Sequence, residues 1–323
     1  MALFYVAHRL FAAHDRAVGA YIASQLAEAA GADSVFLPFC DTDEENLVSG
    51  CKGRTLFELD CARLRRITGM IAVLHGPSLD DGVCMETGFA AALGVPIVVV
   101  TTDFQTYAPV PGGPGSVFAD PLPEAIAAAV VRAHRLGPAG EHTGDRYRGF
   151  LEQNLPTIRA ATAQAVATLL GTERESLPPA RASPAISKLA YLEPSPYIAD
   201  DMWAGVAREL RARGWQVHTA QRLLAGTGTA GAARTDWAAA TSAELAVVDT
   251  RGPETPPGAA LITGACAATG RPVLAAHTGT WHTVADGREP NWRNLMIQYA
   301  VTARFSGTAG FTAAMDALPC AAT

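Results

Sequence analysis

Three features that would assign this protein to a class at once are missing from its 323 residues: a long apolar run, a basic block and a paired-cysteine motif. No apolar stretch reaches the roughly 18 residues of a membrane-spanning helix, and Ile97–Val100 is only long enough for a strand core. The formal net charge is −6 without any Lys/Arg cluster, which argues against a nucleic acid polymer as the main partner but not against a single nucleotide. The six cysteines include no CxxC pair, so we expect free thiols rather than a disulfide framework or a zinc site.

Cofactor and targeting signals are also missing. The sequence has no Gly-rich dinucleotide signature, so we expect neither a nicotinamide nor a flavin, and no metal. Met1–Arg9 carries charge early and lacks a signal-peptide pattern, which predicts a cytoplasmic protein without a membrane partner. Hydrophobic residues make up 49% and charged residues 17%, enough for a large core, and the length suits two domains.

The first half alternates between short apolar segments and helical segments. Strands are predicted at 3–7, 34–38, 69–74 and 96–101, and helices at 15–30, 55–66 and 83–93. This alternation predicts a parallel sheet with helices on both faces. A Pro/Gly-rich loop at 107–117 and a helix at 145–170, broken or kinked at Pro156, complete this half.

The second half restarts the pattern after Gly171–Ser187, a stretch with three prolines that we interpret as a linker. Strands are predicted at 189–192, 215–218 and 245–249, and helices at 201–213 and up to residue 242. The predicted fold class is α/β, with a doubly wound parallel sheet of the flavodoxin or Rossmann type in two tandem domains. The domains are expected at 1–170 and 188–323, with 171–187 as the linker.

An internal duplication relates the two halves without a gap. Each pair is 176 positions apart, as from Gly76 to Gly252; the pairs also include Pro77/Pro253, Gly82/Gly258, Gly88/Gly264, Pro96/Pro272 and Asp60/Asp236. A fixed offset through glycines, prolines and a helix indicates a repeated domain. At the same offset, Asp80, Asp81 and Glu86 become Pro256, Pro257 and Ile262, which can neither transfer protons nor attack carbon. The second copy is therefore expected to be degenerate.

Three carboxylates of the first half are expected at one crevice. Asp80 follows a predicted strand, Glu86 lies in the first turn of the next helix, and Asp60 lies on the preceding helix. Ligands of open parallel sheets bind at the carboxyl ends of the strands, where these side chains meet. The helix dipole favours an ionised acid in the first turn. Such a group of acids suits attack on an electron-poor carbon by one and proton handling by another.

These residues resemble the nucleoside 2-deoxyribosyltransferase family. The likeness is carried by Tyr5, Asp60, the run Asp80–Ala90 and Gly94–Pro96; it covers Leu3–Thr102 well and Leu189–Val301 as a degenerate copy. It implies that Glu86 is the nucleophile and that Tyr5 orients it. It also implies that Asp60 and Asp80 assist the leaving base and hold the sugar. The catalytic residues expected from the resemblance are thus Glu86, Asp60, Asp80 and Tyr5.

The expected substrate-binding residues surround the same crevice. Where the family has a small stretch after the first strand, this chain has His8 and Arg9, and Arg9 suits a phosphate. The acidic loop that begins at Asp41 offers a possible wall of the base pocket; the remaining expected contacts are Asp81, Gly82 and Asn294. Family members are dimers or larger, and a neighbouring chain often completes each site. We therefore expect the degenerate domain to supply Asn294 in a pseudo-dimer, with further homo-oligomers possible.

The implied reaction cleaves or transfers an N-glycosidic bond of a nucleoside or nucleotide through a covalent glycosyl-Glu86 intermediate. A base or water then attacks, so a transferase and a hydrolase remain open, as does a non-catalytic nucleotide-binding sensor. Each residue also has an ordinary structural interpretation. Glu86 and Asp60 suit exposed helical positions, Asp80 suits a helix N-cap and Tyr5 suits a core. Cys84 is expected to be a buried structural thiol facing away from Glu86.

Overall fold

The computed structural model describes residues 2–42, 51–108, 110–113, 115–133, 145–172, 181–224, 229–284 and 288–318. Two five-stranded sheets, both entirely parallel, form within these ranges, and helices flank each of them. This confirms the predicted doubly wound α/β class in two tandem domains. None of the helices in the described ranges combines the length and the apolar character needed to cross a bilayer.

The first sheet has the strand order β2-β1-β3-β4-β5. Its strands are β1 (Phe4–Ala7), β2 (Val35–Phe36), β3 (Gly69–Val73), β4 (Ile97–Thr101) and β5 (Ala129–Arg132). The connecting helices are α1 (Ala13–Ala30), α2 (Lys52–Leu64), α3 (Asp81–Ala92), α4 (Leu122–Ile126) and α5 (Arg146–Gly171), with a short 3₁₀ turn at Ala32–Ser34. Crossovers through helices are what a parallel sheet requires.

The second sheet repeats this order as β7-β6-β8-β9-β10. Its strands are β6 (Ile186–Glu193), β7 (Gln216–Thr219), β8 (Ala243–Asp249), β9 (Val273–Ala276) and β10 (Ala303–Phe305). Its helices are α6 (Met202–Ala212), α7 (Thr229–Ser242), α8 (Pro257–Thr269), α9 (Leu295–Ala300) and α10 (Gly307–Asp316). Strand register repeats as well, because Tyr5 pairs with Met70 and Tyr191 pairs with Ala246, which is 176 positions after Met70.

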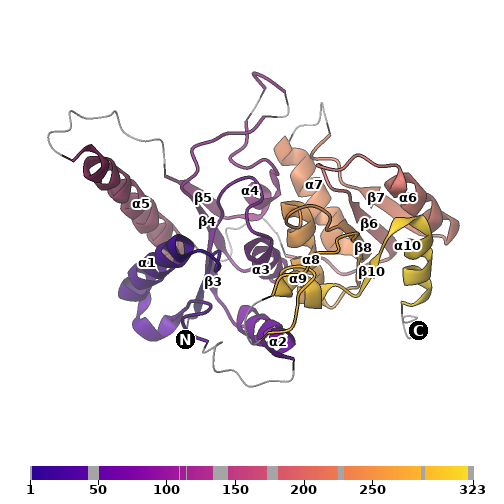
Figure 1. Cartoon of the computed structure of the whole chain (residues 1–323), viewed down its shortest axis with the longest axis horizontal. Helices are drawn as coiled ribbons and strands as arrows, with labels where there is room; N and C mark the ends of the chain where they lie inside the picture. Colours follow the sequence, from indigo (N-terminus) through magenta and orange to yellow (C-terminus); the bar gives the residue numbers. More distant parts are fainter. Residues whose placement is uncertain are drawn as a thin grey trace.

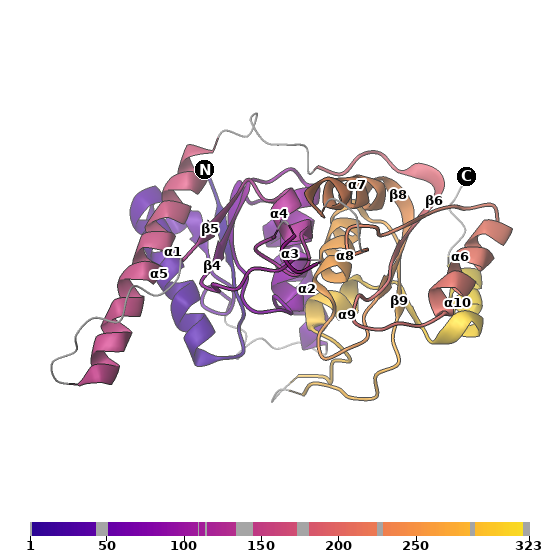
Figure 2. The same cartoon turned by 90° about the horizontal axis from the view of Figure 1, so that it is seen from above.

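Alternation along the strands divides the side chains between two cores. In the first domain, Val6, Ile71 and Val98 pack against α1 and α5 on the outer face. Their neighbours along the strands, among them Tyr5, Met70 and Val99, belong to a core that continues into the second domain. Figures 1 and 2 show the result: α1 and α5 cover one end, α6 and α10 cover the other, and α3 and α8 lie between the two sheets. The shared central core makes the chain a pseudo-dimer.

The contact between α3 and α8 depends on two glycines that are related by the repeat. A Cβ on Gly88 would collide with the backbone carbonyl of Leu261, and one on Gly264 would collide with the carbonyl of Met85. Met85 and Leu261 are themselves 176 positions apart, so the contact is symmetric. Close backbone approach of this kind is open only to glycine. Gly88 and Gly264, which the duplication relates, therefore lie at the point where the two domains cross.

Some element limits differ from the sequence-based expectations for local reasons. Helix α3 starts at Asp81 rather than Val83, because Asp80 is its N-cap and accepts the Val83 N–H at 3.0 Å. Helix α5 is not broken at Pro156 but runs through it; this proline is on the exposed side, where the carbonyl that loses its helical partner can be hydrated. Residues 173–180 of the predicted linker lie outside the described residues.

Replacing Gly264 with Ala should destabilise the protein by about 1–3 kcal/mol, because the added methyl group meets a backbone carbonyl that cannot rotate away. The measurement is urea unfolding. The matched control is Gly231→Ala on the exposed side of α7, where a Cβ meets nothing within 4 Å and helix propensity predicts about 0.5–1 kcal/mol of added stability. Equal effects of the two changes would contradict the close crossing.

Candidate active site

A cavity of about 510 Å³ lies between the two domains, at the carboxyl ends of the strands of the first sheet. First-domain residues around it include His8, Arg9, Asp60, Asp80, Asp81, Gly82 and Glu86. Second-domain residues include Glu254, Trp281, Arg293, Asn294 and Met296. A volume of this size suits a small organic ligand, and its place in the fold is where open α/β sheets bind their ligands.

Glu86 lies at the bottom of this cavity and is only 7% exposed. Its Oε1 accepts a 2.7 Å hydrogen bond from the hydroxyl of Tyr5, which is fully buried on β1. Burial and the nearby charge of Glu86 raise the pKa of Tyr5 well above its usual value, so the phenol remains a donor. The Tyr5 hydroxyl therefore holds the carboxylate, which lines the cavity.

Asp80 combines an unusual backbone with a perturbed charge. Its φ of 62° is rare for a residue other than glycine, and the preceding Leu79 has a φ of 59°. Such strain costs about 1–3 kcal/mol per residue and is found mainly at functional sites. Burial, followed by the charge of Asp81, raises the pKa of Asp80 to about 7, although the Val83 N–H and Arg9 act in the opposite direction. Near neutral pH this carboxyl group therefore gains or loses a proton readily.

Asp81 connects the site to the second domain. Its Oδ2 accepts the backbone N–H of Thr255 at 3.2 Å. Burial raises the pKa of Asp81, and Glu254 adds to this, while the Thr255 N–H opposes it. Asp80 and Asp81 are thus two neighbouring buried acids at the start of α3, and protonation of one is favoured by the charge on the other.

Arg9 bridges the two domains across the cavity. Its Nη2 donates to Glu254 Oε1 at 2.9 Å, and its Nε lies 3.5 Å from Asp80 Oδ2. Arg293 donates to the backbone carbonyls of Thr250 and Gly252, just before Glu254 in the chain. Glu254 Oε2 is buried and has no hydrogen-bond partner among the described residues. This oxygen can accept a hydrogen bond from a ligand.

Of the other residues expected at the site, Asp60 and His8 line the cavity and Asp41 does not. Asp60 is half-buried on α2 and lines the cavity, and its charge helps to raise the pKa of Tyr5. His8 is buried against Gly19, and burial lowers its pKa, so it is neutral. Asp41 is exposed, accepts the Leu37 N–H at 2.7 Å, and is not among the residues lining the cavity. The rest of the acidic loop, from residue 43, lies outside the described residues.

Asn294 reaches the first site from the second domain. It caps α9, and its Oδ1 accepts the Met296 N–H at 3.0 Å. Its Nδ2 lies 2.5 Å from the position that a Cβ on Gly82 would occupy. Gly82 therefore leaves room for the Asn294 amide beside Asp80 at the start of α3. The amide nitrogen is turned toward the first domain as a hydrogen-bond donor.

A loop of the second domain, between β9 and α9, covers part of the cavity. Within the loop, the backbones of Thr283 and Asn291 form an isolated antiparallel bridge. Trp281 lines the cavity, and 89% of its surface is exposed. Glu289 fastens the loop to the first domain: its Oε1 accepts the Gly53 N–H at 2.8 Å at the start of α2. A helix N-terminus stabilises such an anion. The loop is held against α2, which carries Asp60.

Sequence reasoning missed Glu254, Arg293 and Trp281. Glu254 follows the repeated Gly-Pro pair and corresponds to Ser78, so its acidic side chain in an otherwise degenerate copy was a usable signal. Arg293 is next to Asn294 but gives no pattern of its own. Trp281 likewise gives no pattern of its own. Among the described residues, no group of three or more His, Cys, Asp or Glu side chains is placed to hold a metal ion.

The fold and the cavity define an α/β domain with a cavity that a cluster of carboxylates lines. The sequence gives the class: residues 4–145 match the model of the nucleoside 2-deoxyribosyltransferase family, and this part of the chain is a nucleoside 2-deoxyribosyltransferase domain. A solved structure described as a conserved protein from Enterococcus faecalis V583 is similar at 18% identity and a TM-score of 0.32, over 48% of this chain and 98% of that one. No curated protein matches the sequence.

Asp80→Asn should stabilise the protein relative to wild type increasingly as the pH rises from 5 to 8. Because the folded-state pKa of Asp80 is raised, the folded protein keeps this proton at pH 5 and loses it, at a cost, as the pH passes about 7. Asparagine keeps the N-cap, tolerates positive φ and carries no charge. The expected gain between the two pH values is about 2–3 kcal/mol.

Urea unfolding at pH 5 and pH 8 measures this gain. The control is Asp145→Asn, which changes an exposed N-cap aspartate on α5 and should give the same small effect at both pH values. A gain from Asp80→Asn that did not grow with pH would contradict the buried, protonatable state of this acid.

Proposed function

We propose that this protein cleaves the N-glycosidic bond of a nucleoside or nucleotide, with Glu86 as the nucleophile, and passes the sugar to a base or to water. Membership of residues 4–145 in the nucleoside 2-deoxyribosyltransferase family supports a nucleoside glycosyl transfer-type function. One observation carries the assignment of the site. Glu86 is a buried carboxylate that Tyr5 holds and that lines a carboxylate-rich cavity.

In the proposed first step, a carboxylate oxygen of Glu86 bonds to the anomeric carbon while the bond from that carbon to the base nitrogen breaks. The electron pair of this bond goes to the base nitrogen, which takes a proton from Asp80. A pKa of about 7 suits Asp80 to this task, because an acid is most effective when its pKa is close to the working pH. Asp60 accepts hydrogen bonds from the sugar.

In the second step, an acceptor base or a water molecule bonds to the anomeric carbon, the bond to Glu86 breaks, and the acceptor's proton returns to Asp80. Two displacements retain the configuration of the sugar. Arg9 and Glu254 border the substrate on the side of the second domain. The buried Glu254 Oε2 accepts a hydrogen bond from the substrate there.

The deciding experiment is a search for the glycosyl adduct. The protein is incubated with a panel of nucleosides and their monophosphates, quenched in acid, and measured by intact mass and peptide mass spectrometry. A mass increase equal to a pentosyl or phosphopentosyl group on the peptide that contains Glu86 is expected. Base release with and without an acceptor base, followed by chromatography, distinguishes transfer from hydrolysis.

Glu86→Gln is the matched variant, because glutamine keeps the shape and can still accept the Tyr5 hydroxyl bond. This variant should form no adduct. Its activity should fall by more than the factor of about 10²–10⁴ that general acid catalysis typically contributes. The control is Glu209→Gln, which removes a partly buried ion pair with Arg213 on α6, outside the residues lining the cavity, and should leave activity unchanged. Tight binding of a nucleotide without any adduct or base release would instead favour a sensor.

Asn294→Ala should lower turnover if the second domain completes the site, since the amide is the donor that reaches Gly82 and Asp80. Alanine also removes the cap of α9, at a cost of about 1 kcal/mol. Asn294→Asp is therefore the informative partner: it retains the cap but has no amide N–H donor. Turnover at the wild-type level in both variants, measured on folded protein, would remove Asn294 from the mechanism.

A further inference from the structure

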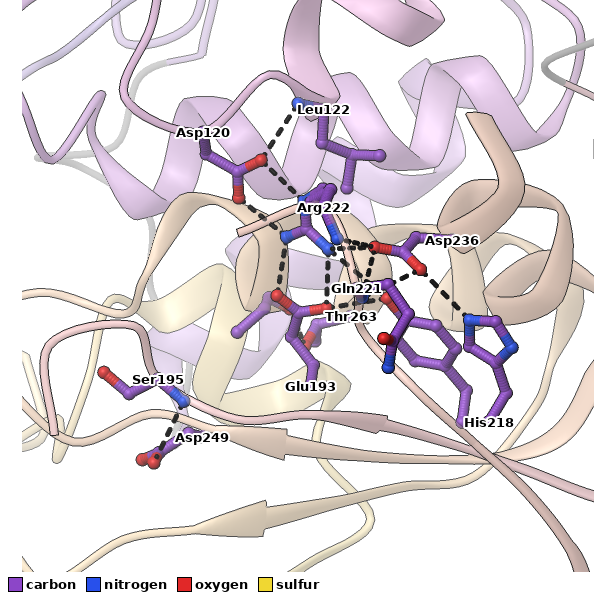
Figure 3. A network of polar contacts seen from close by, with 12 residues as sticks. Asp120, Leu122, Glu193, Ser195, His218, Gln221, Arg222, Asp236, Asp249 and Thr263 are labelled. Atoms are coloured by element: carbon purple, nitrogen blue, oxygen red, sulfur yellow. Dashed lines mark hydrogen bonds and ion pairs between the residues drawn. The ribbon is translucent and has the colours of Figure 1, made fainter. Parts of the chain in front are cut away.

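The second domain contains a buried arginine at the place that corresponds to the first site. Arg222 follows β7, and its side chain has no exposed surface. Figure 3 shows its guanidinium group among the side chains of Asp120, Glu193 and Asp236. A buried charge of this kind is costly unless partners surround it closely. A fully buried arginine is therefore expected to have a structural role.

The partners of Arg222 come from both domains. Asp120, which precedes α4 in the first domain, accepts two parallel bonds of 2.7 Å from Nε and Nη2. Glu193 on β6 accepts from Nη2 at 2.6 Å and from Nη1 at 3.0 Å. Asp236 on α7 lies 3.4 Å from Nη1. Two fork-like pairs with carboxylates are the strongest arrangement that a guanidinium group can make.

The groups around Arg222 correspond to those of the first site. Tyr191 takes the place of Tyr5 in strand register, and Asp236 takes the place of Asp60. The helix carboxylate is lost at Ile262, but Glu193 on the strand replaces it: Glu193 Oε2 accepts the Tyr191 hydroxyl at 2.8 Å, as Glu86 accepts that of Tyr5 at 2.7 Å. The second site has thus kept a tyrosine-bound carboxylate in a new position.

The two domains also exchange side chains in the same way. Asp120 and Asn294 each stand before the short helix that leads to the last strand of their own sheet, and each accepts the backbone N–H two residues later. Asn294 reaches Gly82 in the first domain, and Asp120 reaches the equivalent Gly258 in the second. Asp120 is therefore the counterpart of Asn294 in the second site.

The guanidinium group occupies the space that the first site leaves open. A Cβ on Gly258 would collide with Arg222 Nη2 and would lie within 2.7 Å of both Glu193 Oε1 and Asp120 Oδ2. At Gly82, the atoms nearest to the corresponding point belong to Asn294 and Asp80, beside the 510 Å³ cavity. The Asp236 carboxylate also accepts hydrogen bonds from the backbone N–H groups of Gln221 and Arg222, and it is hydrogen-bonded to His218 Nε2.

We infer that the second domain keeps a carboxylate site equivalent to the first, that the guanidinium group of Arg222 fills it permanently, and that this group fastens the two domains together through Asp120. The chain then offers one open site, and its second site serves as a latch. This inference rests on the geometry of the second domain and does not require the proposed enzymatic activity.

Chemical rescue of Arg222→Ala tests the inference. Removing the guanidinium group leaves three buried carboxylates around an empty space, so the melting temperature should fall by on the order of 10 °C. Guanidinium chloride at low millimolar concentration, well below denaturing levels, should restore part of this loss in a saturable way. Urea, which is planar but uncharged, should not, and the wild-type protein should gain nothing from either compound.

Arg213→Ala is the matched control. It removes an arginine that also contacts two carboxylates, Glu209 and Asp316, but at the surface. It should shift the melting temperature little and show no rescue. An Arg222→Ala protein as stable as wild type, or one stabilised equally by urea and guanidinium, would overturn the inference.

Asp120→Asn covers the case in which Arg222→Ala does not fold. It keeps the shape of the side chain that crosses between the domains but removes its charge, and should lower the melting temperature by several degrees. Asp316→Asn, at the exposed partner of Arg213, serves as its control and should have a small effect. Equal effects of the two substitutions would show that Asp120 is not a latch.

Discussion

The close contact of α3 with α8, made possible by Gly88 and Gly264, is the constraint on which the rest of the molecule depends. It brings the inner faces of two similar sheets onto one shared core. It also places the start of each central helix opposite the other domain. As a result, Asn294 reaches Gly82 and Asp120 reaches Gly258, and neither site is complete within its own domain. A bulkier residue at the crossing would separate both pairs at once.

The two sites of the pseudo-dimer treat buried carboxylates in opposite ways. At the first, Asp80 and Asp81 are desolvated with little compensation, since Arg9 stays 3.5 Å from Asp80 and is itself shared with Glu254. Their raised pKa values record the cost of that arrangement. At the second, Arg222 lies among three carboxylates and forms close ion pairs with Asp120 and Glu193.

The central part of the fold could be predicted from the sequence better than its periphery. Strands such as β3 and β4 are runs of apolar residues buried on both faces, and helical segments alternate with such strands, so both halves were predicted as parallel α/β domains. The strands β5, β9 and β10 and the short helices α4 and α9 were not predicted. They are short, and their identity depends on pairing with a neighbour rather than on a local pattern.

The candidate site shows the same division. Glu86, Asp60, Asp80 and Tyr5 were selected from spacing and family likeness, and the structure places them together at one cavity, with Tyr5 behind Glu86. Glu254 and Arg293 were missed: Arg293 gives no pattern of its own, and the only signal for Glu254 was an acid at a repeat position in an otherwise degenerate copy. The loss of the helix carboxylate in the second copy was visible at Ile262, but its replacement by Glu193 was not. That carboxylate moved from a helix to a strand, and only folding brings it to the Tyr191 hydroxyl.

The sequence by itself determined the repeat, the parallel α/β class and the half of the chain that carries the acids, because these follow from local periodicity and from residue types at a constant offset. Only the tertiary structure decided which cavity stays open, which acids hold a proton and where Arg222 lies. Those properties depend on burial and on charges that are distant in the chain but a few ångströms apart in space. Coulomb energies and desolvation respond to that spatial distance and not to position along the sequence.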